Sequence, residues 1–281
     1  MKNSALAPIV IAALGLVTLA QAPTARAAEP VQFVALLEGG VGGGAQAQGY
    51  VDQLVAGFAK RCGWPGAASL YTNSRERALE YMNAEHPAFG LFSLGAYLAL
   101  VDAHKLTVVG VAEAKRAGGR QYFVVAKQGT SLADCKGQRL ASNHADDPLF
   151  IDHVVLAGAA RLADFDLVPT RRPVQTLKAV IRDEARCALI DDAQKESLSS
   201  VEGGAELKPL WASAELPGIP IVALEGTNKD LVAAFKQALP DTCSGDQALC
   251  TNIGIERLQA ASDADYAALV RRYHARDVAR P

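Results

Sequence analysis

The stretch LADCKGQRLASNHADDPLF, Leu132 to Phe150, shows how this chain is organised. A short apolar strand, Arg139 to Ala141, is followed by a polar loop, Ser142 to Asp147, and by Pro148 at the expected start of a helix. Such a loop is a common ligand cradle, because the first N–H groups of a helix are unpaired and its dipole favours negative charge. Asp and Pro are also ordinary helix-start residues. The loop is therefore either a plain helix cap or part of a binding site.

The N-terminal segment predicts export. Lys2 precedes an uncharged apolar run from Ala5 to Ala20, and Ala25-Arg26-Ala27 has the small residues of a cleavage site. This pattern is typical of a secretory signal peptide over residues 1–27, because the apolar run is short and no stop-transfer pattern follows it. We expect a soluble, periplasmic mature chain that begins near Ala28.

Composition indicates a globular α/β protein and argues against a nucleic-acid partner. Half of the 281 residues are apolar, which is ample for one large or two medium domains. Without Lys2 and Arg26, 26 basic residues remain against 30 acidic ones, a net charge of −4. No basic run indicates nucleic acid or an anionic membrane surface as a partner.

Alternating strands and helices predict two parallel α/β units. Strands are expected at 31–37, 67–71, 89–92, 106–111, 121–127, 139–141, 166–168, 188–190, 210–211 and 220–224. Helices are expected at 47–62, 75–85, after 93, and at 148–160, 174–183, 229–239 and 263–275. The chain would leave the first unit near Lys127 and return near Val222. Two crossings of this kind form a hinge, with a cleft between the two units.

The candidate motifs for catalysis, nucleotides and metals are weak. The loop Glu38 to Gly44 is glycine-rich but matches neither the dinucleotide fingerprint nor the P-loop, so no cofactor is expected. Ser93 lies in FSLGA, without the nucleophile-elbow pattern of an esterase. His144 and His153 lie nine residues apart, which is no standard metal spacing. We expect neither an enzyme nor a metal protein.

Five cysteines in an exported chain predict disulfides. Cys243 and Cys250 enclose a short loop and are the simplest pair. Cys135 and Cys187 each precede a predicted strand, so they would meet at one sheet edge if those strands are parallel neighbours. Cys62 is then left over.

Three segments in this order, GLFSLGAYL, GRQYFVVAKQGTSLADCKGQRLA and VQTLKAVIRDEARCALIDDAQ, resemble the phosphate/phosphite/phosphonate solute-binding proteins of ABC transporters. The likeness extends from Val31 to Tyr273. It implies the type 2 periplasmic binding protein fold, two α/β lobes joined by two crossover strands, with lobe 1 at 28–127 and 222–281 and lobe 2 at 128–221. It also implies a monomer that binds a small anionic or zwitterionic solute and delivers it to an ABC permease in the inner membrane.

The resemblance also implies which residues face the ligand. They are Glu38, Gly39, Gly40, Tyr50, Ser93, Tyr97, Ser142, Asn143, His144, Gln175 and Asp191. Relatives that bind phosphonates have a Ser/Thr/Gly-rich loop where this chain has Asp146 and Asp147, two carboxylates that would repel a dianion. Asp191 is expected to hold an ammonium or hydroxyl group of the ligand, unless Asp192 simply caps a helix there.

One alternative keeps the fold and changes the partner. A periplasmic sensing or accessory protein could present a small molecule to a signalling or redox partner instead of a permease.

Overall fold

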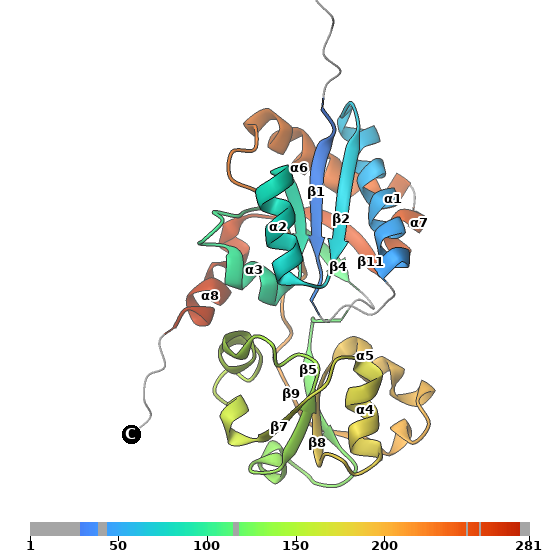
Figure 1. Ribbon diagram of the computed structural model, residues 1–281, viewed down its shortest axis with the longest axis vertical. Helices are drawn as coiled ribbons and strands as arrows, with labels where there is room; N and C mark the ends of the chain where they lie inside the picture. The colour runs from blue at the N-terminus through green and yellow to red at the C-terminus, as the bar shows by residue number, and fades with distance from the viewer. Residues whose placement is uncertain (1–28, 39–43, 115–117, 246, 253, 276–281) are drawn as a thin grey trace, which may run out of the picture.

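The computed structural model describes residues 29–38, 44–114, 118–245, 247–252 and 254–275, which form two α/β lobes (Figure 1). Lobe 1, the upper lobe in that view, contains a six-stranded sheet, and lobe 2 contains a five-stranded sheet. The predicted signal peptide at 1–27 and the predicted ligand contacts Gly39 and Gly40 lie outside the described residues. The two-lobed α/β class is the one that the sequence predicts.

The sheet of lobe 1 is part parallel and part antiparallel. In spatial order its strands are β11 (Ile255–Ala260), β4 (Thr107–Ala114), β10 (Ile219–Ala223), β3 (Phe89–Phe92), β1 (Val31–Leu36) and β2 (Ala67–Thr72). β1 is parallel to both of its neighbours, whereas β10 is antiparallel to β3 and β4. Because parallel strands end at the same edge, the loops after β1, β2 and β3 gather together.

Helices cover both faces of this sheet. They are α1 (Gly44–Cys62), α2 (Arg75–Glu85), α3 (Leu94–Leu100), α6 (Lys229–Gly245), α7 (Gln247–Thr251) and α8 (Asp263–Tyr273). α1 and α6 pack on one face, where Phe58, Phe89 and Phe235 form an aromatic cluster with Trp64. α2, α3 and α8 cover the other face. Burial on both faces explains the nearly unbroken apolar run of β1, in which Gln32 is the one polar residue.

Lobe 2 repeats this arrangement on a smaller scale. Its strands, in spatial order, are β7 (Asp166–Pro169), β6 (Arg139–Ser142), β8 (Cys187–Asp191), β5 (Tyr122–Ala126) and β9 (Lys208–Ala212). Its helices are α4 (Pro173–Ile181), α5 (Asp192–Ser197), the short η1 (Leu132–Cys135), η3 (Leu162–Asp164), η4 (Leu198–Ser200) and η5 (Gly204–Glu206), and the π-helical η2 (Phe150–Val155). β6 is parallel to β7 and β8, so the loops after these strands also share one edge.

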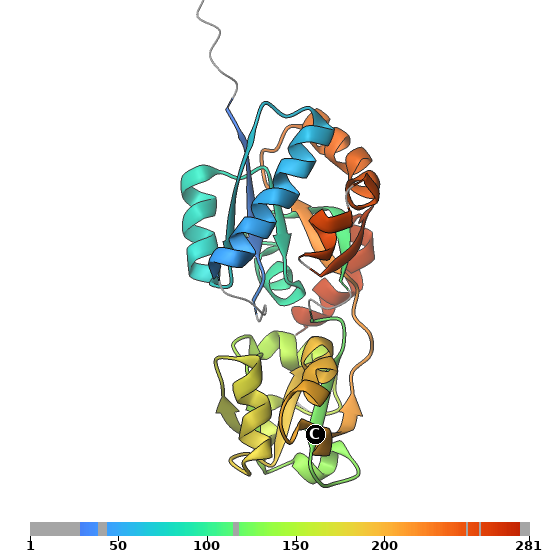
Figure 2. The same ribbon diagram turned by 90° about the vertical axis from the view of Figure 1, so that its right-hand side faces the viewer.

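Two segments cross between the lobes, one from β4 to β5 and one from β9 to β10 (Figures 1 and 2). Residues 121–127 are expected in lobe 1 from the sequence, whereas β5 pairs with β8 and β9 in the sheet of lobe 2. All five residues of β5 are buried, so their pattern predicts a strand without indicating its sheet. We therefore propose that lobe 2 runs from β5 to β9, and that the rest of the mature chain forms lobe 1.

Several elements differ from expectation, and the short helices α5 and α7 were not expected. The helix expected over 148–160 ends earlier, at Val155. β11 was not expected, because it is an edge strand that buries only Ile255 and Leu258 and lacks a strong apolar signal. α6 continues beyond Leu239 to Gly245 with Pro240 inside it.

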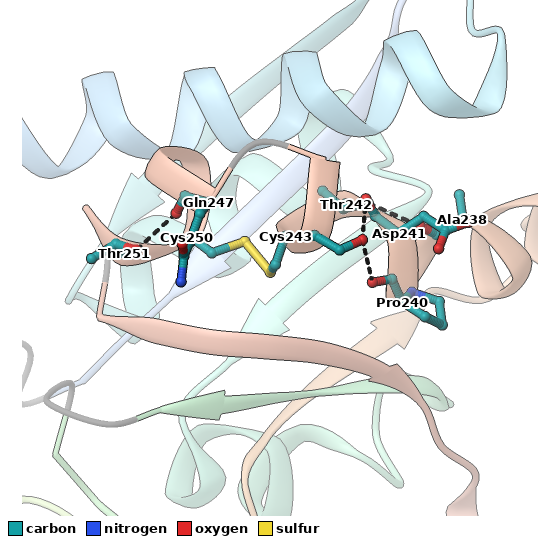
Figure 3. The surroundings of a disulfide bond; sticks show 9 residues. Ala238, Pro240, Asp241, Thr242, Cys243, Gln247, Cys250 and Thr251 are labelled. Atoms are coloured by element: carbon teal, nitrogen blue, oxygen red, sulfur yellow. Dashed lines mark hydrogen bonds between the residues drawn. A yellow bond between two sulfur atoms is a disulfide. The ribbon is translucent and has the colours of Figure 1, made fainter.

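Both predicted disulfides are present. Cys135–Cys187 joins the segment before β6 to the start of β8, and these strands are parallel neighbours as the pairing requires. Cys243–Cys250 joins α6 to α7 (Figure 3). Cys62 is a free thiol.

We expect Cys62 to react slowly with alkylating reagents. Its thiol is half-buried, and burial raises its pKa to about 11. Because the thiolate is the reactive form, the reactive fraction at pH 8 should be roughly 100-fold below that of an ordinary thiol. Iodoacetamide labelling of the non-reduced protein, read by mass spectrometry, should show one slow site and two intact disulfides. Labelling as fast in the native as in the denatured protein would contradict this.

Candidate functional site

A cavity of about 1380 Å³ lies between the lobes. Its lining includes Glu38, Asn73, Ser74, Arg75 and Ser93 from lobe 1, Asn143, His144, Thr170, Arg171 and Asp191 from lobe 2, and Arg120 from a crossing segment. Most of these residues follow the carboxyl ends of parallel strands, which is where α/β sheets bind ligands. The loops at the carboxyl ends of the strands in both lobes thus form a single site.

The structure brings together most of the predicted ligand contacts that it describes. Glu38, Tyr50, Ser93, Asn143, His144 and Asp191 line the cavity. Ser142, Tyr97 and Gln175 do not belong to this lining. Ser142 is buried, and its Oγ donates to the carbonyl of Leu189 at 3.1 Å.

Tyr97 and Gln175 lie away from the cavity for different reasons. Tyr97 is buried in the core, where its ring packs edge-on against Tyr266 at 5.4 Å. Burial also raises the pKa of Tyr97. Gln175 is exposed, and its Oε1 accepts a hydrogen bond from the backbone N–H of Arg171 at 3.3 Å. Gln175 therefore holds the loop before α4 in place.

His144 is held by a buried glutamine. Its Nε2 lies 2.7 Å from Oε1 of Gln194, which also accepts from the backbone N–H of Asp191 at 3.2 Å. The Nε2 of Gln194 donates to Oδ1 of Asn143 at 3.1 Å. These contacts fix which end of the amide is oxygen, so Nε2 of His144 must carry a hydrogen.

Asp191 serves the structure of lobe 2. It is 5% exposed and caps α5, its Oδ1 accepting from the backbone N–H of Gln194 at 2.8 Å. Burial raises its pKa, and His144, 3.7 Å away, acts in the opposite direction. Gly118, with φ at +80°, packs so closely that a Cβ there would lie 2.2 Å from Oδ2 of Asp191. Only glycine accommodates both that conformation and that contact.

Ser93 offers an unused hydroxyl. Its Oγ is buried and has no hydrogen-bond partner among the described residues, and it makes no capping bond to α3. A buried hydroxyl left without a partner costs about 1–3 kcal/mol. A ligand atom that hydrogen-bonds Ser93 would recover this free energy.

Asp147 connects the two lobes. Its Oδ2 accepts from Nη2 of Arg75 at 3.2 Å and from the hydroxyl of Tyr273 at 3.0 Å, both in lobe 1. Within lobe 2, its Oδ1 accepts from the backbone N–H of Phe150 at 3.0 Å. Burial, followed by the charge of Asp147, raises the pKa of Tyr273 to about 12, so the phenol stays protonated and donates. We call Asp147 with Arg75 and Tyr273 the interlobe contact.

The interlobe contact is reinforced by its neighbours. Arg75 donates from Nε and Nη2 to the two carboxylate oxygens of Glu38, at 2.8 and 2.9 Å. Nδ1 of His153 in lobe 2 lies 2.9 Å from the carbonyl of Tyr273. The ring of Phe150 packs so tightly on α3 that a Cβ at Gly95 would be 3.3 Å from it. The lobes therefore touch at a packed joint beside the cavity as well as through the crossing segments.

Several residues that line or support the cavity were not predicted from the sequence. Arg75 begins the helix after β2, and the same strand–loop–helix reasoning applied to β1 and β3 would have included it. Gln194 stands three residues after Asp191, which is the spacing of a capping box. Thr251 and Asn252 also line the cavity, directly after the disulfide-bonded Cys250. No sequence signal indicates that this segment reaches the site.

Over the described ranges, no three His, Cys, Asp or Glu side chains converge as they would around a metal ion. No helix in those ranges has the length and apolarity that crossing a membrane requires.

The sequence matches the family model described as "ABC transporter, phosphonate, periplasmic substrate-binding protein" over residues 46–266. This range includes both lobes and nearly all of the cavity lining. No curated protein sequence matches the chain.

Solved structures share the fold at low sequence identity. A binding protein component of an ABC phosphonate transporter from Pseudomonas aeruginosa aligns with a TM-score of 0.65 and 13% identity, over 86% of this chain and 85% of the other. PhnD1 from Prochlorococcus marinus, in complex with methylphosphonate, aligns with a TM-score of 0.65 and 10% identity, over 86% and 97%. The aliphatic sulphonate binding protein SsuA from Escherichia coli aligns with a TM-score of 0.57 and 14% identity, over 87% and 90%. These likenesses establish the two-lobed periplasmic binding protein fold.

Proposed function

The chain belongs to the family of periplasmic substrate-binding proteins of phosphonate ABC transporters, and on this premise we propose that it holds a small anionic or zwitterionic solute in the cavity between its lobes. One observation carries the proposal: polar groups of both lobes line the same cavity, where the buried hydroxyl of Ser93 has no partner among the residues that the structure describes. A solute that contacts both lobes stabilises their closed arrangement, which is the signal such proteins present to a membrane partner.

The proposed contacts are those predicted residues that line the cavity, together with one addition. Glu38, Tyr50, Ser93, Asn143 and His144 supply charges, hydroxyls and an amide from both lobes. Arg171 is added because its exposed guanidinium reaches the lining and makes no ion pair with the described residues. Asp191 acts through the position of His144 and Gln194.

The remaining parts of the proposal follow from the family. Residues 1–27 direct export to the periplasm, and the mature chain acts as a monomer on an ABC permease of the inner membrane. It makes and breaks no bond and binds no nucleic acid. A sensing role would use the same cavity with a different partner, and no described residue favours it over transport.

The proposal is tested by screening the mature protein for thermal shift and for closure. The panel contains phosphate, methylphosphonate, ethanesulfonate, amino acids and small amines. At least one compound should raise the melting temperature and reduce the radius of gyration in X-ray scattering. Ser93→Ala should weaken the binding of that compound about tenfold, because one hydrogen bond to a ligand contributes about 1.4 kcal/mol. No shift with any compound would refute solute binding.

A further inference from the structure

The arginines that line the cavity are mostly neutralised by the protein itself. Arg75 is bound by Glu38 and Asp147 at 2.8 and 3.2 Å, so this group carries a net charge of −1. Arg120 pairs with Glu113 and, at 2.6 Å, with Glu215, so it forms a second group of net charge −1. Neither guanidinium is available as the counter-charge of a solute anion. A phosphate or phosphonate dianion placed beside these groups would meet net negative charge.

Two charges of the lining remain uncompensated within the described residues, and they have opposite signs. Arg171, after β7, and Asp146, after β6, both line the cavity, and neither side chain has an ion-pair or hydrogen-bond partner among the described residues. Both belong to lobe 2, on adjacent parallel strands whose ends share one edge. The lobe 2 edge of the cavity thus presents one cation and one anion.

His144, in the same loop as Asp146, is already paired within lobe 2. Nε2 of His144 is committed to Gln194, whose Oε1 lies 2.7 Å away. Tyr122 packs on the ring edge-on at 5.3 Å, and Asp191 lies 3.7 Å from Nε2. His144 and Asp191 therefore have partners within lobe 2, and neither is a free counter-charge for a solute.

We propose that the solute is a zwitterion with one single negative charge, carboxylate or sulfonate, matched to Arg171, and one ammonium group matched to Asp146. This inference rests on the proposed function and narrows its solute class. A solute of zero net charge leaves the paired groups of the cavity undisturbed. It also gives each uncompensated side chain one partner, which a phosphonate dianion does not.

Matched pairs that differ only in an amine test the inference by calorimetry. The pairs are β-alanine with propanoate, taurine with ethanesulfonate, and 2-aminoethylphosphonate with ethylphosphonate. The amine-bearing member should bind at least tenfold more tightly in each pair, and β-alanine or taurine should bind more tightly than 2-aminoethylphosphonate. Ethylphosphonate or ethanesulfonate binding as tightly as its amine partner overturns the inference and leaves solute binding standing. Absence of binding by every compound overturns both.

Three variants test which side chain binds each charged group of the solute. Asp146→Asn should remove most of the preference for the amine, because the ammonium group loses its carboxylate partner. Arg171→Gln should lower the affinity for the zwitterion about tenfold. Asp241→Asn, at an exposed aspartate outside the cavity lining, is the matched control and should change neither affinity. An unchanged amine preference in Asp146→Asn overturns the assignment.

Discussion

Asp147→Ala is expected to open the joint between the lobes and to lower the melting temperature by about 5 °C. The change removes the acceptor of Tyr273 and Arg75, and also the capping contact to the backbone N–H of Phe150. Hydrogen bonds to a charged group contribute about 1.5–3 kcal/mol each, but Arg75 is about one-third exposed and retains Glu38, so we expect a total loss of about 2–3 kcal/mol. X-ray scattering of the solute-free protein should show a larger radius of gyration.

The neighbouring residue supplies the control. Asp146 is exposed and has no described partner, so Asp146→Ala should leave the melting temperature and the scattering profile unchanged in the absence of solute. Tyr273→Phe keeps the ring packing and removes only the donated hydrogen bond, so it should show a smaller opening in the same direction. An Asp147→Ala protein with the parent's scattering profile would show that the crossing segments alone set the lobe arrangement.

Cys135→Ala with Cys187→Ala should cause the largest loss of stability. The disulfide closes a chain segment of 52 residues, whereas Cys243–Cys250 closes one of 7. By the chain-entropy relation these correspond to about 4 and about 2.5 kcal/mol of stabilisation. Alanine is used because both cysteines of the longer bridge are fully buried, where serine would bury a hydroxyl group.

Guanidinium unfolding followed by circular dichroism measures this difference. The Cys135/Cys187 variant should unfold at a lower denaturant concentration than a Cys243→Ala, Cys250→Ala variant, which serves as the matched control. Equal midpoints for the two variants would contradict the loop-length argument.

The fold could be predicted well because its signals are local. β3 and α2 have the predicted bounds, since an apolar run and a Ser74 cap mark them directly. The Cys135–Cys187 bond could be predicted once the strands that follow the two cysteines were assumed to be parallel neighbours. The sequence does not show which of the two sheets contains β5, because a strand buried on both faces can belong to either lobe. The family resemblance noted in the sequence is confirmed by the family model.

The site was predicted less well because side-chain pairing is not local. The loops reaching the cavity were mostly found, but their chemistry depends on partners far away in sequence. Asp147 was expected to repel an anion, yet it is bound by Arg75, 72 residues earlier, and by Tyr273, 126 residues later. No periodicity or motif encodes such long-range pairs.

The position of β10 determines the order in which the protein can fold. β10 lies between β3 and β4, so the sheet of lobe 1 stays split until residues 219–223 have arrived. Lobe 2, by contrast, is one continuous segment from β5 to β9 and needs no later residue for its sheet. During synthesis or export, the domain encoded second can therefore complete its sheet first. Until β10 is present, the earlier strands of lobe 1 have unpaired edges, and unpaired edges favour aggregation.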